Sequence, residues 1–104
     1  MRRHMMAFKF KDETSEETIQ AVQDGYRAMQ EGNAGLLHVT VDPNISTSGF
    51  KRYDWILTMD FATKASWRQY EGSDAHDRMV ADNLTGNLAG ITSIDYDIGE
   101  TPDV

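Results

Sequence analysis

The segment from Tyr53 to Phe61 alternates apolar and mostly polar side chains, and this pattern limits the fold more than any other in the chain. A period of two residues is typical of a β-strand with one covered face. One side of the strand would carry Tyr53, Trp55, Leu57, Met59 and Phe61, and the other Asp54, Ile56, Thr58 and Asp60. A strand with such an apolar side needs a sheet and a covering layer, so the chain has to build a core around it.

Three further segments show the same alternation and are predicted to be strands. In 4–11 one face holds His4, Met6, Phe8 and Phe10, and in 36–41 one face holds Leu37, Val39 and Val41, with His38 opposite. In 92–98 the alternation places Thr92, Ile94, Tyr96 and Ile98 opposite Ser93, Asp95 and Asp97. We expect the apolar faces to meet the helices. The other face of the sheet would then mix charged residues such as Asp95 and Asp97 with Met5, Ala7 and Ile56.

The first helix is predicted to begin at Thr14. Thr14 and Glu17 fit a capping box, in which the threonine side chain caps the helix and the glutamate side chain reaches back. Helical spacing then relates a stripe of apolar residues that we expect to be buried: Ile19, Val22, Tyr26 and Met29. Glycines within 32–35 end this helix.

Two shorter helices are predicted after the strand 53–61. Thr63 would cap the first, which carries Trp67 and Tyr70 and stops near Gly72. Ser73 or Asp74 would start the second, with an inner face of His76, Met79, Val80, Asn83 and Leu84. The breaker at 42–44 and the polar residues that follow predict an exposed loop over 45–51.

The order strand, helix, strand, strand, helix pair, strand predicts an α+β fold of the ferredoxin-like type, an antiparallel sheet with helices on one face. The length of 104 residues fits a single domain over 1–104, and we expect its polar tail, 99–104, to fray. Because the second face of the sheet is half apolar and half charged, we expect a homodimer in which two sheets pack together.

Composition argues against several classes of function. The net charge of −7 argues against nucleic acid or an anionic membrane as partner. The lack of cysteine excludes disulfides, thiolate nucleophiles and Cys-based zinc sites. The three histidines show no metal-binding spacing, so we expect neither a metal nor a cofactor. No stretch looks like a secretory signal or a membrane span, and we expect a cytoplasmic location.

Five segments resemble, in order and spacing, the stress-responsive A/B-barrel (Dabb) family over nearly the whole chain: HMMAFKFK, TSEETI, YDWILTMDF, WRQYEGSDAH and SIDYDI. The resemblance implies a ferredoxin-like protomer whose sheet packs on that of a second copy, giving a dimeric α/β barrel. Within the family, the motifs are most similar to olivetolic acid cyclase-like members, which close a ring by an aldol reaction without metal or cofactor.

That resemblance implies roles for individual residues. Tyr70 and His76 match the catalytic tyrosine and histidine of those members, and His4 matches the histidine that opens their first strand. Trp55 stands where they carry a further histidine. The implied chemistry is removal of a proton next to a carbonyl by His76, while Tyr70 donates a hydrogen bond to the developing enolate oxygen.

Two hypotheses for the function remain open at this stage. In the first, Tyr70 and His76 act in a pocket for a small hydrophobic ligand, with a cofactor-free cyclase-like or lyase activity. Side chains bordering that pocket would be His4, Phe8, Tyr26, Trp55, Met79 and Val80. In the second, the protein is a non-catalytic, stress-associated or structural dimer in which the same side chains only pack the core.

Overall fold

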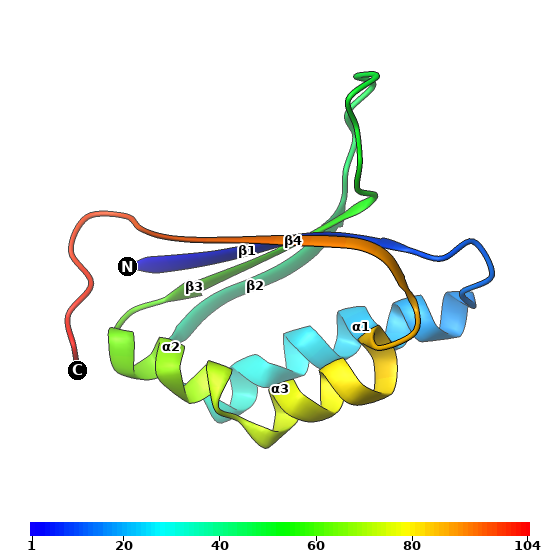
Figure 1. Ribbon diagram of the computed structural model, residues 1–104. Helices are drawn as coiled ribbons and strands as arrows, with labels where there is room; N and C mark the ends of the chain where they lie inside the picture. The colour runs from blue at the N-terminus through cyan, green and yellow to red at the C-terminus, as the bar shows by residue number, and fades with distance from the viewer.

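The computed structural model describes residues 1–104 as a curved, four-stranded antiparallel sheet with its helices on one face (Figure 1). The elements are β1 (Arg2–Phe10), α1 (Glu16–Ala28), β2 (Leu36–Pro43), β3 (Trp55–Phe61), α2 (Lys64–Glu71), α3 (Asp74–Met79) and β4 (Leu88–Asp97). A 3₁₀ turn (Met29–Gly32) extends α1, and a π-helical turn (Val80–Leu84) extends α3. The strand order β2-β3-β1-β4 confirms the predicted ferredoxin-like α+β fold. No helix combines the length and the apolar character needed to cross a membrane.

The core lies between the sheet and α1, as the alternations in β1 and β3 and the stripe on α1 predicted. Its central members are Met6, Phe8, Phe10, Val22, Tyr26, Leu57, Met59 and Phe61, with Ile19 and Met29 packed at the margin. Full burial of a large apolar side chain stabilises a fold by about 1.5–3 kcal/mol. Two central strands and one helix therefore hold the molecule together.

The start of α1 differs by one residue from the prediction. Ser15 is the N-cap, and its Oγ accepts a hydrogen bond from the backbone N–H of Thr18 at 3.1 Å. The hydroxyl of Thr14 instead donates to the carbonyl of Asn87 at 3.3 Å, which holds it away from the end of the helix. Since either residue type caps a helix well, the sequence alone could not choose between them.

The predicted faces of β2 are wrong at its start. Leu36 is buried and Leu37 is 49% exposed, the reverse of the alternation read from the sequence. The β2–β3 register shifts between Leu36 and His38, which adds one residue to β2. Because a bulge reverses the sides to which the flanking residues point, Leu36, Val39 and Val41 face the helices.

The caps predicted for the two short helices are confirmed. Thr63 and Ser66 form a capping box at the start of α2, in which each side chain accepts a hydrogen bond from the backbone N–H of the other. Gly72 follows the last turn of α2. Ser73 caps α3 by accepting a hydrogen bond from the backbone N–H of His76 at 3.1 Å. These caps fix the two helices that carry Tyr70 and His76.

The structure reverses the predicted faces of β4. In the β1–β4 register, His4 lies opposite Asp95 and Arg2 lies opposite Asp97, so both aspartates point to the helix side. Arg2 binds Asp97 through two hydrogen bonds of 2.8 and 3.1 Å. Ile94 therefore points to the opposite side. The prediction fails because β4 is an edge strand, whose helix side is open enough to hold ion pairs.

The sheet face turned away from the helices has no covering layer (Figure 1). A shallow, mainly apolar hollow of about 120 Å³ occupies its middle and is lined by Met5, Met6, Ala7, Ile56, Thr92 and Ile94. Ile94 and Tyr96 are exposed there. Arg3 and Asp60 neutralise each other on the same face through hydrogen bonds of 2.8 and 3.1 Å. We call this surface the uncovered face.

The tail after β4 is bonded to α2 and differs from the frayed segment that we expected. The carbonyls of Pro102 and Asp103 accept hydrogen bonds from the backbone N–H groups of Lys64 and Ala65, at 2.7 and 3.1 Å. N–H groups in the first turn of a helix have no partner within the helix. The sequence gives no sign that the tail would reach these donors.

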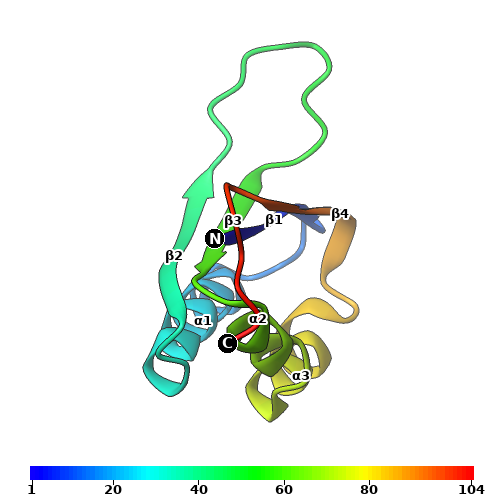
Figure 2. The same ribbon diagram turned by 90° about the vertical axis from the view of Figure 1, so that its left-hand side faces the viewer.

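Residues 44–54 form a long connection between β2 and β3, which rises from the sheet on the side away from the helices (Figures 1 and 2). The predicted exposed loop, 45–51, lies within it. Two hydrogen bonds of 2.8 Å close its base, from the backbone of Asn44 to the carbonyl of Asp54 and from the Asn44 side chain to the carbonyl of Tyr53. We call this segment the arm.

Candidate functional site

A cavity of about 320 Å³ lies between the sheet and the helices, next to the edge strand β4. Its wall combines aliphatic side chains with hydroxyl and imidazole groups: His4, Met6, Tyr26, Tyr70, His76, Val80, Leu84, Thr85, Leu88, Ile91 and Ser93. No lysine, arginine, aspartate or glutamate is part of this wall. The cavity is therefore suited to a small uncharged molecule with a few polar atoms.

Tyr70 lies between the two histidines of the wall. Its ring centroid is 5.8 Å from that of His4 and 5.0 Å from that of His76, which meets it nearly edge to face. The three residues come from β1, α2 and α3. Phe61 of β3 supports the Tyr70 ring from the core at 5.5 Å. The capped helices α2 and α3 thus hold Tyr70 and His76 next to His4 of β1, which is distant from both in sequence.

Asp95 orients the ring of His4. The Nδ1 of His4 is 2.9 Å from Oδ1 of Asp95, and the Nε1–H of Trp67 donates to the same oxygen at 3.3 Å. Arg2 stacks on the Trp67 ring at 4.6 Å, which fixes the indole from its other side. In the tautomer that donates from Nδ1, the Nε2 of His4 is free to accept a proton.

His76 has a similar but more open arrangement. Its backbone is fixed by the Ser73 cap, and its Nδ1 lies 3.3 Å from Oδ1 of Asp77, the next residue. The side chain of His76 is 29% exposed, whereas that of Asp77 is 73% exposed. The imidazole therefore lies on the cavity wall with access to solvent, and its carboxylate partner points outward.

The two phenols of the cavity remain protonated far above neutral pH. Burial raises the pKa of Tyr26 to about 12, and the Tyr70 hydroxyl opposes this in smaller part. Burial also raises the pKa of Tyr70, and the neighbouring Tyr26, Glu71 and Asp95 add to the rise. Both groups keep their protons, and because their hydroxyls interact with each other, one phenol proton is left to donate a hydrogen bond elsewhere.

Five of the eight residues singled out from the sequence line this cavity: His4, Tyr26, Tyr70, His76 and Val80. Three others lie outside its wall. Phe8 is fully buried and packs edge-on against Phe10 at 5.4 Å. Trp55 lies opposite Phe8 at the arm end of β3, where it covers the margin of the core. The end of the Met79 side chain lies against Gly25 of α1, so it fills the contact between α1 and α3.

Asp95 is a side chain of the candidate site that the sequence did not identify. The alternation in 92–98 placed Asp95, together with Asp97, on the sheet face away from the helices. The signal that could have found it is the pairing of the first and last strands, because their register puts Asp95 directly opposite His4. Nothing in the sequence spacing identifies Thr85, Leu88 or Ile91, which reach the wall through the turn before β4 and through β4 itself.

The profile of the Stress responsive A/B Barrel Domain (Dabb) matches residues 3–98, from the start of β1 to the end of β4. The chain belongs to this family. None of the curated proteins matches the sequence.

Solved structures extend the comparison of the Dabb fold. A protein from Arabidopsis thaliana is 22% identical, with a TM-score of 0.83 over 97% of this chain and 98% of that one. A dimeric ferredoxin-like protein from Jannaschia is 18% identical, with a TM-score of 0.81 over 93% and 98%. A hydroxynitrile lyase from Passiflora edulis is 16% identical, with a TM-score of 0.80 over 96% and 94%. At these identities, the matches show the fold that this Dabb domain shares with them.

Proposed function

We propose that this Dabb domain is a cofactor-free enzyme that moves a proton to make or break a carbon–carbon bond in a small uncharged carbonyl compound, as cyclase-like or lyase members do. The observation that carries the proposal is the position of Tyr70 between His4 and His76 on the wall of one cavity. A purely structural core has no need of two imidazoles, each in contact with a carboxylate, next to one buried phenol. Perturbed or precisely held titratable groups in a cavity are typical of catalytic sites.

The cavity also limits the ligand. Its volume of about 320 Å³ is at the lower end of the range for small-molecule sites, which is about 300–1,000 Å³. A wall without charged side chains offers no partner for a phosphate or a carboxylate. The favoured ligand is therefore a compact, neutral molecule with an apolar part and one or two oxygens, such as a β-diketone, a phenolic ketone or a hydroxynitrile.

The proposed reaction uses the phenol and an imidazole in separate roles. Nε2 of His76 removes a proton from the carbon next to a carbonyl, and the electron pair forms an enolate. Tyr70, which is protonated at neutral pH, donates a hydrogen bond to the enolate oxygen. The enolate carbon then attacks a second carbonyl of the same molecule, so the new carbon–carbon bond forms as the π bond of that carbonyl breaks, and the resulting alkoxide takes the proton that His76 had removed. His4, held by Asp95, is the second base on the opposite side of Tyr70.

The same groups fit a lyase reaction, for which the hydroxynitrile lyase neighbour is a precedent in fold. One imidazole would take the hydroxyl proton of a hydroxynitrile, the carbon–carbon bond would break, and cyanide would leave with the other imidazole as proton donor. Two imidazoles that line one cavity, each next to Tyr70, match a reaction in which one proton is taken and one is given.

A compound panel with matched variants tests the proposal. β-Diketones, β-polyketide mimics and hydroxynitriles are titrated while the fluorescence of Trp67 is followed in a Trp55→Phe background, and turnover is then measured for those that bind. His76→Ala should reduce turnover by about 10²–10⁴-fold, whereas His38→Ala, on the exposed side of β2, should leave it unchanged. If no compound binds, or if His76→Ala matches the wild type, the non-catalytic hypothesis is favoured.

We also propose that the domain is a homodimer whose uncovered faces pack together. The face is rich in apolar side chains, and its Arg3–Asp60 pair is already neutralised within the protomer. Several neighbours in fold are described as dimeric. Sedimentation at micromolar concentration should give a species of twice 11.8 kDa. A single species of 11.8 kDa would contradict the proposal.

A further inference from the structure

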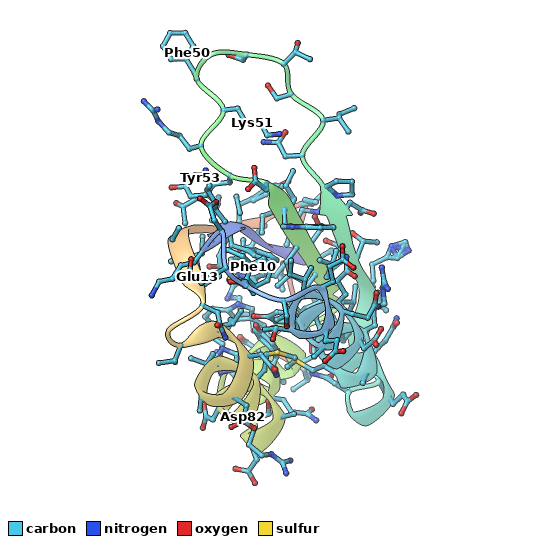
Figure 3. The ribbon with its side chains drawn as sticks, turned by 90° about the vertical axis from the view of Figure 1, so that its right-hand side faces the viewer. Phe10, Glu13, Phe50, Lys51, Tyr53 and Asp82 are labelled. Carbon is cyan, nitrogen blue, oxygen red and sulfur yellow. The ribbon has the colours of Figure 1, made fainter.

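The arm places its most apolar side chains far from any core. Ile45 is 89% exposed and Phe50 is 84% exposed, although both are large hydrophobic residues. Figure 3 shows Phe50 near the tip of the arm, with its ring pointing away from the rest of the molecule. Exposed aromatic residues on a projecting segment are typical of contact with another protein.

The arm is held in one shape rather than left as a loose loop. Successive side chains bond to backbone N–H groups two residues further on, from Asn44 to Ser46, from Ser46 to Ser48 and from Ser48 to Phe50, at 3.0–3.2 Å. The N–H of Lys51 donates to the carbonyl of Ser48 and closes the tip at 3.1 Å. A segment ordered before it meets its partner loses less conformational entropy on binding.

The direction of the arm identifies the kind of partner. Figures 1 and 2 both show it on the side of the sheet away from the helices, which is the side of the uncovered face. Stacked sheets pack about 10 Å apart, whereas about five extended residues in each limb of the arm span roughly 15 Å. The tip of the arm would therefore extend past a second sheet that packs on this face. It would lie beside an edge strand of that second sheet.

The area of the uncovered face also bears on the role of the arm in a dimer. Four strands spaced about 5 Å apart and about eight residues long cover roughly 500 Å². A stable interface of standard size takes about 800 Å² from each partner. The footprint of the sheet is small, and the arm is the segment in position to add contact area to a dimer built on the two uncovered faces.

We propose that the arm is a clamp that reaches past the uncovered face and buries Phe50 and Ile45 against the outer strand of a second copy of this chain. The inference rests on the proposed homodimer and goes beyond it, because it assigns the stability of the dimer to a segment outside the sheet. The two clamps of a dimer are related by its two-fold axis, so each subunit both gives and receives one.

The first test is the dissociation constant of the dimer, measured by sedimentation. The double variant Ile45→Ser, Phe50→Ser should weaken the dimer at least about 100-fold, because two apolar side chains are lost from each of two arms. Val104→Ser changes a residue that is 92% exposed in the tail and is the matched control, with an unchanged constant. Far-UV circular dichroism checks that the fold of each variant is retained.

The second test uses the absence of cysteine from the chain. A photoreactive maleimide placed on Phe50→Cys should give a covalent dimer on illumination, whereas the same label on Val104→Cys should not. The clamp would be overturned if the double variant dimerised with the dissociation constant of the wild type and if labelled Phe50→Cys gave no covalent dimer. That result would leave the proposed homodimer intact. A monomeric wild type would overturn both proposals.

Discussion

Replacing the buried phenol of Tyr26 should change how the stability of the protein depends on alkaline pH. The pKa of Tyr26 is about 12 in the folded protein, and the ordinary value is about 10. The folded state therefore holds the proton more tightly than the unfolded chain. Its contribution to stability is fully present below pH 10 and is lost as the pH rises towards 12.

The size of this effect follows from the two values. Between pH 10 and 12, the contribution of Tyr26 to the free energy of unfolding falls by about 1.4 kcal/mol per pH unit, or roughly 3 kcal/mol in all. In Tyr26→Phe the hydroxyl is gone, so the slope of stability against pH should be shallower by this amount. Groups that are not in contact with Tyr26 act equally on both proteins, and their effect cancels in the difference; Tyr70, whose pKa Tyr26 helps to raise, is compared separately in Tyr70→Phe.

Urea unfolding at several pH values from 8 to 11.5, followed by circular dichroism, measures the two slopes. Ser93→Ala, a change in the same cavity that removes no titrating group, is the control and should keep the wild-type slope. Absorbance at 295 nm provides a second measurement, because Tyr26→Phe should remove ionisation near pH 12 and not near pH 10. Equal slopes for Tyr26→Phe and the wild type would refute the reasoning.

Three further outcomes are expected. Gly35→Ala should lower the free energy of unfolding by about 1–3 kcal/mol, because its β-carbon would press on the buried capping box of α2, whereas Gly32→Ala has open space and should cost little; urea unfolding compares them. Asp95→Asn should weaken the hydrogen bond to His4, which long-range ¹H–¹⁵N spectra would report as a changed balance of ring tautomers. Removing residues 100–104 should speed exchange of the first amide protons of α2 by about fivefold, the effect of one hydrogen bond of about 1 kcal/mol; no change in exchange would contradict the described role of the tail.

Local patterns were sufficient for the parts of the fold where one side of an element is fully covered. The alternation in β3 placed Leu57, Met59 and Phe61 in the core, and helical spacing did the same for Val22 and Tyr26. In each case, the apolar residues recur with the period of the strand or helix, so they all lie on one face, and that face is buried. The same holds for the caps of α2 and α3, whose signals lie within three or four residues.

The patterns were insufficient where the outcome depends on another segment. Alternation in β4 showed that two faces differ, but only the pairing with β1 decides which face meets the helices. The start of β2 depends on a bulge, and the N-cap of α1 depends on a bond between Thr14 and Asn87, more than 70 residues away. Asp95 was missed for the same reason, since its contact with His4 comes from the pairing of β1 with β4.

The position of β1 in the sheet has a consequence for how the protein is made. β1 leaves the ribosome first, yet it lies in the middle of the sheet, with β3 on one side and β4 on the other. Pairings between distant segments slow folding, and an apolar strand with open edges can pair with other chains. The nascent chain is therefore exposed to aggregation until β4, the strand that brings Asp95 to His4, has been synthesised.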